Sequence, residues 1–322
     1  MAFNQKKILI SICATLAVLL IGAIAIRAYT VFQTTVENRN DFVVEPAKQE
    51  VDLNPGQSAT VNISVTSRIK DPVTFDIKSE DIVGSNNPQQ PVVLLGGDKS
   101  PYSLKDYLHP EVNQFTLHFG ERIQIPVKVD LPKDAAPGGF YGAVIVSNAP
   151  SKLNAGSSTA AAQAATIISR IGSLLFVRVL GPVNQSGRLS DFRIKEAGPI
   201  YQNGNLTFQV YFNNDGNIHL VPYGYITVKN MWGATIDQLP IDAYFALPHS
   251  LRYREIPWGK NIALGRYTAT VTLNRGYAST TDDMTISFWV IPYKIMIIVI
   301  LIILILVALI YFFRRNFELK RK

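Results

Sequence analysis

The sequence predicts an all-β protein: two tandem immunoglobulin-like β-sandwich domains between an N-terminal signal or anchor helix and a C-terminal transmembrane helix. Three observations support this prediction. Apolar and polar residues alternate with a period of two along much of residues 39–291, as in half-buried strands. Turn signals rich in Gly, Pro and Asn separate these runs, which is typical of antiparallel sandwiches. Uncharged apolar runs lie near both ends of the 322-residue chain.

Residues 1–30 contain the first apolar run, residues 8–26, which follows Lys6 and Lys7. The run is longer than the usual core of a signal peptide, yet Ala23-Ile24-Ala25 offers a small-residue cleavage pattern. A cleaved signal peptide and a retained signal anchor therefore both fit. Either of them places the chain from residue 31 onward outside the cytoplasm.

The first β-sandwich domain is predicted at residues 39–182. Val61, Ile63 and Val65 alternate with polar residues, and the same alternation recurs along residues 122–131. Pro126 lies within the second run. Because proline has no N–H to donate to a neighbouring strand, it predicts an edge strand there.

Two insertions are predicted in this domain, near residues 83–113 and 150–165. The first is polar and rich in Pro and Gly, and the second is rich in Ser, Ala and Gly. Loops on a rigid sandwich often carry binding, so these are the candidate contact regions. Disordered surface insertions without a binding role fit the same composition.

The second β-sandwich domain is predicted at residues 187–291, after a linker-like stretch at 181–188. Its clearest strand runs have apolar residues at every second position, as at Leu206, Phe208 and Val210. Its last strand leads directly into the C-terminal apolar run, so we expect this domain to lie against the bilayer.

Residues 295–313 form the C-terminal apolar run, without a charge, Gly or Pro. A helix of this length spans about 28 Å, close to the roughly 30 Å of a hydrocarbon core. The tail at 314–322 carries five basic residues, and such clusters stay on the cytoplasmic side. The predicted location is the cell membrane, single- or double-pass, with residues 31–291 on the extracellular face.

The net charge of +7 comes from the two ends of the chain. Residues 31–291 carry 22 Lys and Arg against 23 Asp and Glu, so the predicted β region is close to neutral. The basic excess flanks the apolar runs and indicates a lipid bilayer rather than nucleic acid as the charged partner.

No catalytic, cofactor-binding or metal-binding residue is predicted, and no ligand-binding residue is assigned. The lone cysteine, Cys13, lies in the first apolar run, so the exported region has no thiol chemistry. Ser67-Arg68-Ile69-Lys70 matches an S-x-x-K pattern but lacks its partner motifs. The four histidines show no metal-ligand spacing: His109, His118, His219 and His249.

Other polar and aromatic groups are also better explained structurally. The oxygen-rich stretch at 213–217 lacks the glutamate of a calcium loop and predicts a tight turn. Asp282-Asp283 is more typical of a solvated loop than of acid–base chemistry. Four aromatic residues could line a carbohydrate face, although burial in a core is the favoured interpretation: Tyr141, Tyr244, Tyr253 and Trp258.

The order of elements resembles the WxL-interacting proteins of Gram-positive bacteria. Phe42-Val43-Val44-Glu45-Pro46, followed by Asn54-Pro55-Gly56-Gln57, looks like the family's opening strand pair and turn. Pro137-Gly138-Gly139-Phe140-Tyr141 is similar to its glycine-rich strand entry, and Leu264-Gly265-Arg266-Tyr267 to a late strand. The resemblance implies a peptidoglycan-binding domain, a second β domain and a membrane helix, with an adhesion or scaffolding role.

The predicted function is that of a non-enzymatic, membrane-anchored surface protein of the bacterial cell envelope. Its partners would be the lipid bilayer and cell-wall polymer, another surface protein, or both, and no nucleic acid. An alternative is an assembly subunit of a surface structure that accepts a partner strand at an exposed sheet edge. A wall hydrolase is a further alternative, which would need a carboxylate cluster or a histidine-centred triad in a cleft.

Overall fold

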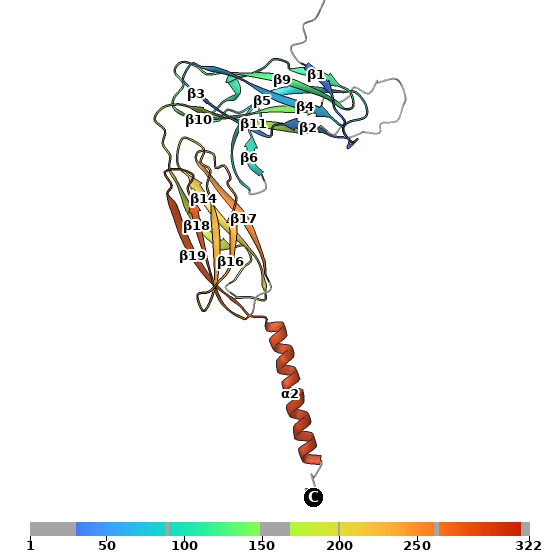
Figure 1. Ribbon diagram of the computed structural model, residues 1–322, viewed down its shortest axis with the longest axis vertical. Coiled ribbons are helices and arrows are strands. Elements are labelled where there is room, and N and C mark those ends of the chain that lie inside the picture. The colour runs from blue at the N-terminus through green and yellow to red at the C-terminus, as the bar shows by residue number, and fades with distance from the viewer. Residues whose placement is uncertain (1–29, 88–89, 149–167, 199, 261–263, 317–322) are drawn as a thin grey trace, which may run out of the picture. The chain divides into compact units, whose positions relative to one another are not determined.

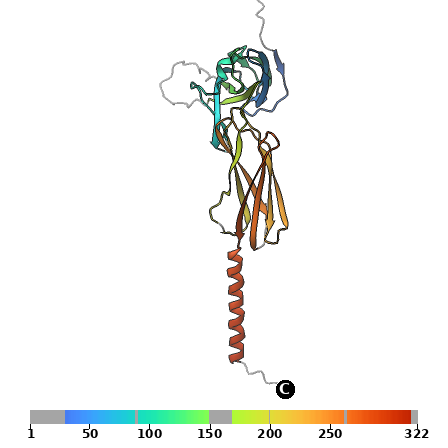
Figure 2. The same cartoon turned by 90° about the vertical axis from the view of Figure 1, so that its left-hand side faces the viewer.

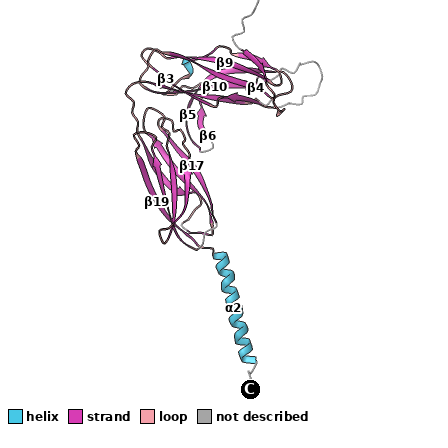
Figure 3. Cartoon of the chain, viewed as in Figure 1, coloured by secondary structure: helices cyan, strands magenta, loops and turns pink. Residues whose placement is uncertain are grey.

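The computed structural model describes residues 30–87, 90–148, 168–198, 200–260 and 264–316. The predicted N-terminal signal or anchor segment and the insertion near 150–165 lie outside the described residues. Strands dominate the described chain, and the predicted all-β class is confirmed (Figure 3). Two β-sandwiches are followed by one long helix, α2 (Tyr293–Asn316).

The first sandwich consists of two sheets with the strand orders β1-β9-β4-β2 and β3-β11-β10-β5-β6; β7 also pairs with β9 in the first sheet, and β8 also pairs with β5 in the second. The strand bounds are β1 (Thr30–Gln33), β2 (Phe42–Glu45), β3 (Lys48–Leu53), β4 (Ser58–Ser67), β5 (Val73–Asn87), β6 (Gln90–Leu94), β7 (Leu108–Pro110), β8 (Gln114–Leu117), β9 (Glu121–Asp130), β10 (Gly138–Asn148) and β11 (Arg170–Val179).

The core of this sandwich lies between the two sheets (Figure 2). Phe75 of β5 is fully buried, and its ring centre lies 4.9 Å from that of Phe42 in β2, which belongs to the other sheet. The apolar residues that alternate along β4 and β9 face inward, as their spacing predicts. Period-two patterning therefore explains which face of each sheet is buried.

Pro126 does not mark an edge strand, and that prediction is wrong. It lies in β9, which pairs with β4 on one side and with β1 and β7 on the other. The carbonyl oxygen of Pro126 accepts the N–H of Glu111 at 3.0 Å, so its nitrogen also faces the β7 side. The register leaves position 126 between the start of β1, where Thr30 pairs with Gln124, and the end of β7, where Pro110 pairs with Val127. Proline is tolerated because no partner carbonyl is paired there.

The predicted insertion near 83–113 is largely regular structure rather than an open loop. Its beginning completes β5, which forms a hairpin with β6, and its end contains the short helix η1 (Lys105–Tyr107) and β7. Both backbone N–H groups at the start of η1, those of Leu104 and Lys105, donate to the buried carboxylate of Asp81 at 3.0 and 2.9 Å. This side chain anchors the returning chain.

The second sandwich has a sheet of order β12-β14-β17 and a sheet of order β13-β19-β18-β15-β16. The strand bounds are β12 (Gly187–Ile194), β13 (Ile200–Tyr201), β14 (Gly204–Asn214), β15 (Tyr223–Asn230), β16 (Thr235–Ile241), β17 (Ser250–Lys260), β18 (Gly265–Asn274) and β19 (Thr281–Val290).

Trp258 of β17 forms the centre of the second core. It is almost fully buried, with ring centres 5.9 Å from Phe208 of its own sheet and 5.9 Å from Phe288 of the opposite sheet. Its indole N–H donates to the carboxylate of Asp237 at 3.1 Å. The one polar atom of a large buried ring is therefore satisfied.

The chain divides into two compact units. One comprises residues 1–81, 103–135 and 141–177, and the other comprises 82–102, 136–140 and 178–322. The whole β5–β6 hairpin, from Ile82 to Leu94, thus belongs to the second unit, where the Arg252 guanidinium donates to the carbonyl oxygen of Asn87 at 3.2 Å.

α2 begins three residues after the end of β19, and Figure 1 shows it continuing from that end of the second sandwich. Residues 296–315 are long and apolar enough to cross a membrane, and none of them is buried against the rest of the described chain. Arg314 and Arg315 lie in the last turn.

Candidate functional site

A hollow of about 590 Å³ opens at the margin of the second sandwich, where β12 ends beside β19. Arg193, Lys195 and Glu196 line it from β12 and the segment that follows, and Phe288 forms part of its apolar wall. Cations, a carboxylate and an aromatic floor could together hold a small polar ligand, so the internal contacts of these groups decide what the hollow can do.

The charged groups of the hollow are already engaged within the chain. Arg193 donates to the hydroxyl of Tyr211 and lies over its ring, 4.6 Å from the centre. Glu255 accepts from Gln209 at 2.9 Å and from Lys195 at 3.0 Å, and these hydrogen bonds lower the pKa of its carboxyl. The Glu196 carboxylate accepts the N–H of Thr207 at 2.9 Å. These contacts hold β12 against β14 and β17.

The aromatic residues considered for a carbohydrate face do not form one. Tyr141, Tyr244 and Trp258 are buried, as the core interpretation predicts. Tyr253 lies on the outer face of β17, where its ring stacks on Tyr211 with centres 4.8 Å apart. The Tyr211 ring therefore covers one face of Tyr253, and the four aromatic residues do not share one exposed surface.

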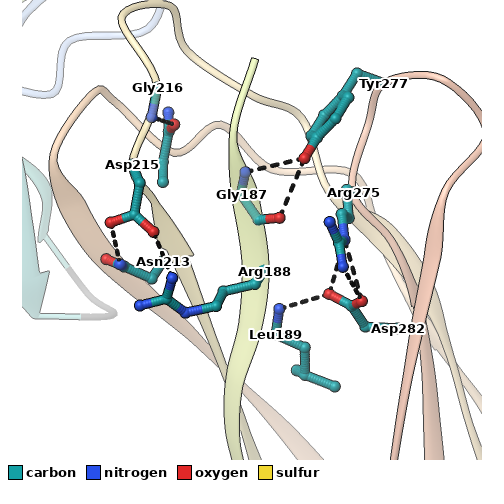
Figure 4. Close-up of polar contacts among 10 residues, drawn as sticks. Gly187, Arg188, Leu189, Asn213, Asp215, Gly216, Arg275, Tyr277 and Asp282 are labelled. Carbon is teal, nitrogen blue, oxygen red and sulfur yellow. Dashed lines mark hydrogen bonds and ion pairs between the residues drawn. The ribbon is translucent and has the colours of Figure 1, made fainter. Parts of the chain in front are cut away.

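Asp282 and its neighbour Asp283 have separate structural partners. Asp282 pairs with Arg275 and accepts the backbone N–H of Leu189 at 2.8 Å, as Figure 4 shows. Asp283 accepts the hydroxyl of Thr272 at 2.5 Å. The two carboxylates thus hold strands together and are not paired for acid–base chemistry.

The oxygen-rich stretch at 213–217 forms the tight turn that its sequence predicts. Asn214 is fully buried, its amide donates to two carbonyl oxygens, and its side-chain oxygen accepts the N–H of Gly216 at 2.9 Å. Asp215 accepts from Asn213 at 2.6 Å and from Arg188 at 2.8 Å (Figure 4). These oxygens close the turn and fasten β12.

The histidines are dispersed in the described chain. His118 is exposed and contacts Glu121 at 3.1 Å, and His249 stacks on Tyr102. His109 belongs to β7, and His219 lies between β14 and β15. Among the described residues, no group of three or more His, Cys, Asp or Glu side chains is placed to hold a metal ion.

The S-x-x-K stretch lies at the end of a strand and not at the start of a helix. Ser67 is the buried last residue of β4, and its hydroxyl accepts the N–H of Ile69 at 3.4 Å. Arg68 makes two hydrogen bonds of 2.6 Å to the carboxylate of Asp41. This geometry ties β4 to the entry of β2.

The outer edge of β6 is the feature of the predicted contact region that best fits binding. β6 pairs with β5 alone among the described strands, and it ends its sheet. Val93 and Leu94 are both more than one-third exposed. No charged residue occurs from Ile82 to Gly97. Edge strands are usually protected by charge, proline or bulges. β6 has no charge, and its protection is limited to Pro91 and to the register shift of the β5–β6 pair between Gly84 and Asn87, so the uncharged apolar part of this edge is Val92, Val93 and Leu94.

Sequence reasoning located this region but missed the edge strand within it. The polar residues around the β5–β6 turn suggested a loop, whereas Val92, Val93 and Leu94 form the short apolar run of a strand. The absence of charge over residues 82–97 was the signal that could have identified it.

No protein-family model and no curated protein matches the chain. Similar solved structures include the class 5 fimbriae chaperone CfaA, with 13% identity over 78% of this chain and 100% of that chain and a TM-score of 0.37. The E. coli chaperone DraB has 13% identity over 78% and 98%, with a TM-score of 0.33. The Pseudomonas aeruginosa CupB2 chaperone has 12% identity over 76% and 99%, with a TM-score of 0.33.

Proposed function

We propose that this protein is a non-enzymatic, membrane-anchored component of the cell envelope, whose β-sandwiches bind a partner on the extracellular side. The observation that carries the proposal is the junction between the second sandwich and α2. β19 ends at Val290, α2 begins at Tyr293, and the helix packs against no other part of the described chain.

The helix needs an apolar environment that the described chain does not provide. Its apolar side chains are exposed around its whole circumference, whereas a surface helix of a soluble domain has a polar face. Tyr293 and Tyr311 lie towards its two ends, where aromatic rings prefer the membrane interface. Arg314 and Arg315 favour a cytoplasmic C-terminus, which would leave the sandwiches outside.

A binding role is favoured over catalysis because the polar clusters of the second sandwich connect its strands to one another. The Arg275–Asp282 pair, the Asn214 turn and the Lys195–Glu255 pair each join separate strands. Their donors and acceptors are directed at backbone or at each other, and catalysis would need groups directed at a substrate.

The β6 edge favours a protein as the extracellular partner. An extended segment of another surface protein could pair with the free backbone of β6 while its apolar side chains contact Val93 and Leu94. This is the strand-accepting form of the proposed function. Binding of peptidoglycan remains a prediction from the resemblance to WxL-interacting proteins.

The anchor is tested by placing charges in the middle of α2. We expect Leu304→Lys with Leu306→Lys to release the protein from carbonate-washed membranes, because each central lysine costs about 2.5–3.5 kcal/mol of insertion free energy. Leu304→Ala with Leu306→Ala is the matched control and should stay in the membrane fraction. Both variants are compared in a chain that begins at residue 31 and is reconstituted in vesicles, because a retained N-terminal segment would hold either variant in the membrane. Retention of the lysine variant at the control level would then contradict the anchor.

The binding edge is tested by cross-linking in native membranes. We expect one defined protein partner to cross-link to the wild type and to be lost with Val93→Lys, because a charge protects an edge from pairing. Phe32→Lys, at an exposed apolar position of edge strand β1, is the control and should keep the product. Equal amounts of cross-linked product from both variants would exclude the β6 edge. Retention of the protein on purified wall fragments would favour cell-wall polymer as the partner.

A further inference from the structure

The turn between β15 and β16 presents two large apolar side chains to solvent. Met231 is more than half exposed and Trp232 is 85% exposed, the highest value among the large hydrophobic residues of the described chain. The turn is well ordered by hydrogen bonds: the side-chain oxygen of Asn230 accepts the N–H groups of Trp232 and Ala234, both at 3.0 Å. Gly233 supplies the positive φ of 80°. The hydrogen-bonded turn therefore holds Trp232 in an exposed position.

Strand register places this turn at the end of the sandwich where α2 begins. Asn230 pairs with Tyr267, and Tyr267 pairs with Phe288, so one row of residues crosses β15, β18 and β19. Trp232 lies two residues beyond this row, and Tyr293 lies five residues beyond it in the same direction. At about 3.3 Å per residue, both lie within roughly 17 Å of the row.

The same end of the sandwich carries further exposed apolar residues. Leu264 precedes β18, and Trp289 of β19 pairs with Ile200; all three side chains are exposed. A Cβ atom on Gly265 would lie 3.7 Å from the sulfur of Met231, so the turn packs close to the start of β18. The apolar surface thus continues from the turn towards the helix.

The three segments closest to the turn and to the start of α2 carry cations only: residues 229–234, 264–267 and 288–294 contain Lys229, Arg266 and Lys294, and no acidic residue. The neighbouring carboxylates of Glu196 and Asp237 accept the backbone N–H of Thr207 and the indole N–H of Trp258. Tryptophan favours the boundary between lipid headgroups and acyl chains, and neighbouring cations favour anionic headgroups. The residue types therefore match a lipid interface better than a dry protein contact.

We infer that the β15–β16 turn is a second membrane contact, in which Trp232 and Met231 enter the interfacial layer of the leaflet where α2 enters. This inference rests on the proposed function, because α2 must span the bilayer for the turn to reach it. A helix alone leaves the sandwich free to tilt about the junction. A second contact on another strand pair fixes the sandwich relative to the bilayer.

The test uses the full chain in vesicles of phosphatidylcholine and phosphatidylglycerol, with Trp289→Phe as the background. Emission then comes from Trp232 and from the buried Trp258. Lipids brominated on the acyl chain report contact with the membrane, and iodide reports contact with water. We expect brominated lipids to quench Trp232 and iodide to leave it unquenched, and Trp232→Phe in the same background should abolish the lipid-dependent loss of emission.

A matched control moves the tryptophan to the opposite end of β15. Tyr223→Trp, combined with Trp232→Phe and Trp289→Phe, replaces an exposed aromatic residue that pairs with Asn274, far from the α2 end. Iodide should quench this protein and brominated lipids should not.

If the protein resists carbonate extraction but Trp232 is quenched by iodide, or by neither reagent, only the membrane contact is overturned. Extraction of the protein from the vesicles by carbonate would overturn both the membrane contact and the proposed anchor.

Discussion

Asp282 and Arg275 form an ion pair in which both carboxylate oxygens accept from the guanidinium, at distances of 2.5–3.0 Å (Figure 4). One of these oxygens also accepts the backbone N–H of Leu189 at 2.8 Å. Arg275 and Asp282 flank the turn between β18 and β19, whereas Leu189 belongs to β12 in the other sheet. A single carboxylate therefore joins the two layers of the second sandwich at their margin.

Asp282→Asn should lower the free energy of unfolding by about 1.5–3 kcal/mol, the usual contribution of hydrogen bonds to a charged group. The variant keeps the shape of the side chain but loses the charge that binds Arg275. Urea unfolding of the full chain in detergent measures the effect. Asp283→Asn, at an exposed position on the same strand, should change stability by less than about 0.5 kcal/mol. Equal losses from both variants would show that the layer contact contributes nothing specific.

The same carboxylate should make the second sandwich sensitive to acid. Burial alone would raise the pKa of Asp282, but the hydrogen bonds from Arg275 and Leu189 outweigh it and lower the pKa below its ordinary value. The stabilisation is therefore complete above the unfolded pKa of about 3.9 and is lost as pH falls through the lower folded value. The stability difference between wild type and Asp282→Asn should shrink as pH falls below about 4. A difference that stays constant to lower pH would contradict this assignment.

Tyr277 makes a second connection to the same edge strand. Its hydroxyl accepts the N–H of Gly187 at 3.0 Å and donates to the carbonyl oxygen of that residue at 3.2 Å. Tyr277→Phe leaves both buried backbone groups unpaired and should cost about 1–3 kcal/mol. Tyr225→Phe removes the hydroxyl of an exposed tyrosine on β15 and should leave the stability nearly unchanged. Thermal denaturation of the two variants and the wild type measures the difference. A neutral Tyr277→Phe would mean that water replaces the hydroxyl.

Trp258 should carry more of the second core's stability than any polar contact. Trp258→Ala removes a buried ring between the two sheets and should cost about 3–5 kcal/mol. Trp232→Ala is the control in detergent solution, because the exposed ring contributes little to the folded sandwich, within about 0.5 kcal/mol. Near-ultraviolet circular dichroism with urea titration compares the two. Similar losses would contradict the different burial of these tryptophans.

The sequence was sufficient to predict the strands whose apolar residues alternate, because period-two patterning directly encodes which face is buried. Val61 and Ile63 on β4, and Phe208 and Val210 on β14, face the cores as expected. The C-terminal helix was equally predictable from its composition. The burial of Trp258 followed from its size and polar handle.

Features that depend on long-range pairing were not predictable in the same way. Pro126 suggested an edge, but its tolerance depends on where β1 begins, at Thr30, and where β7 ends, at Pro110, both distant in the chain. Asp282 was expected to be solvated because the sequence shows no acidic partner clustered with it, and its actual backbone partner, Leu189, lies 93 residues before it. The polar turn of the β5–β6 hairpin likewise concealed an apolar edge strand. Local composition describes each segment, whereas these roles arise from neighbours that only the fold brings together.

The central claim is that α2 crosses the membrane with the β-sandwiches on the extracellular side, and labelling of single cysteines tests it most directly. In a Cys13→Ser background, Lys70→Cys places a thiol on an exposed position of the first sandwich, and Lys320→Cys places one in the basic tail. We predict that a membrane-impermeant maleimide labels Lys70→Cys on intact cells and labels Lys320→Cys only after the membrane is opened. Labelling of both positions on intact cells, or of neither until the cells are opened, would contradict the claim.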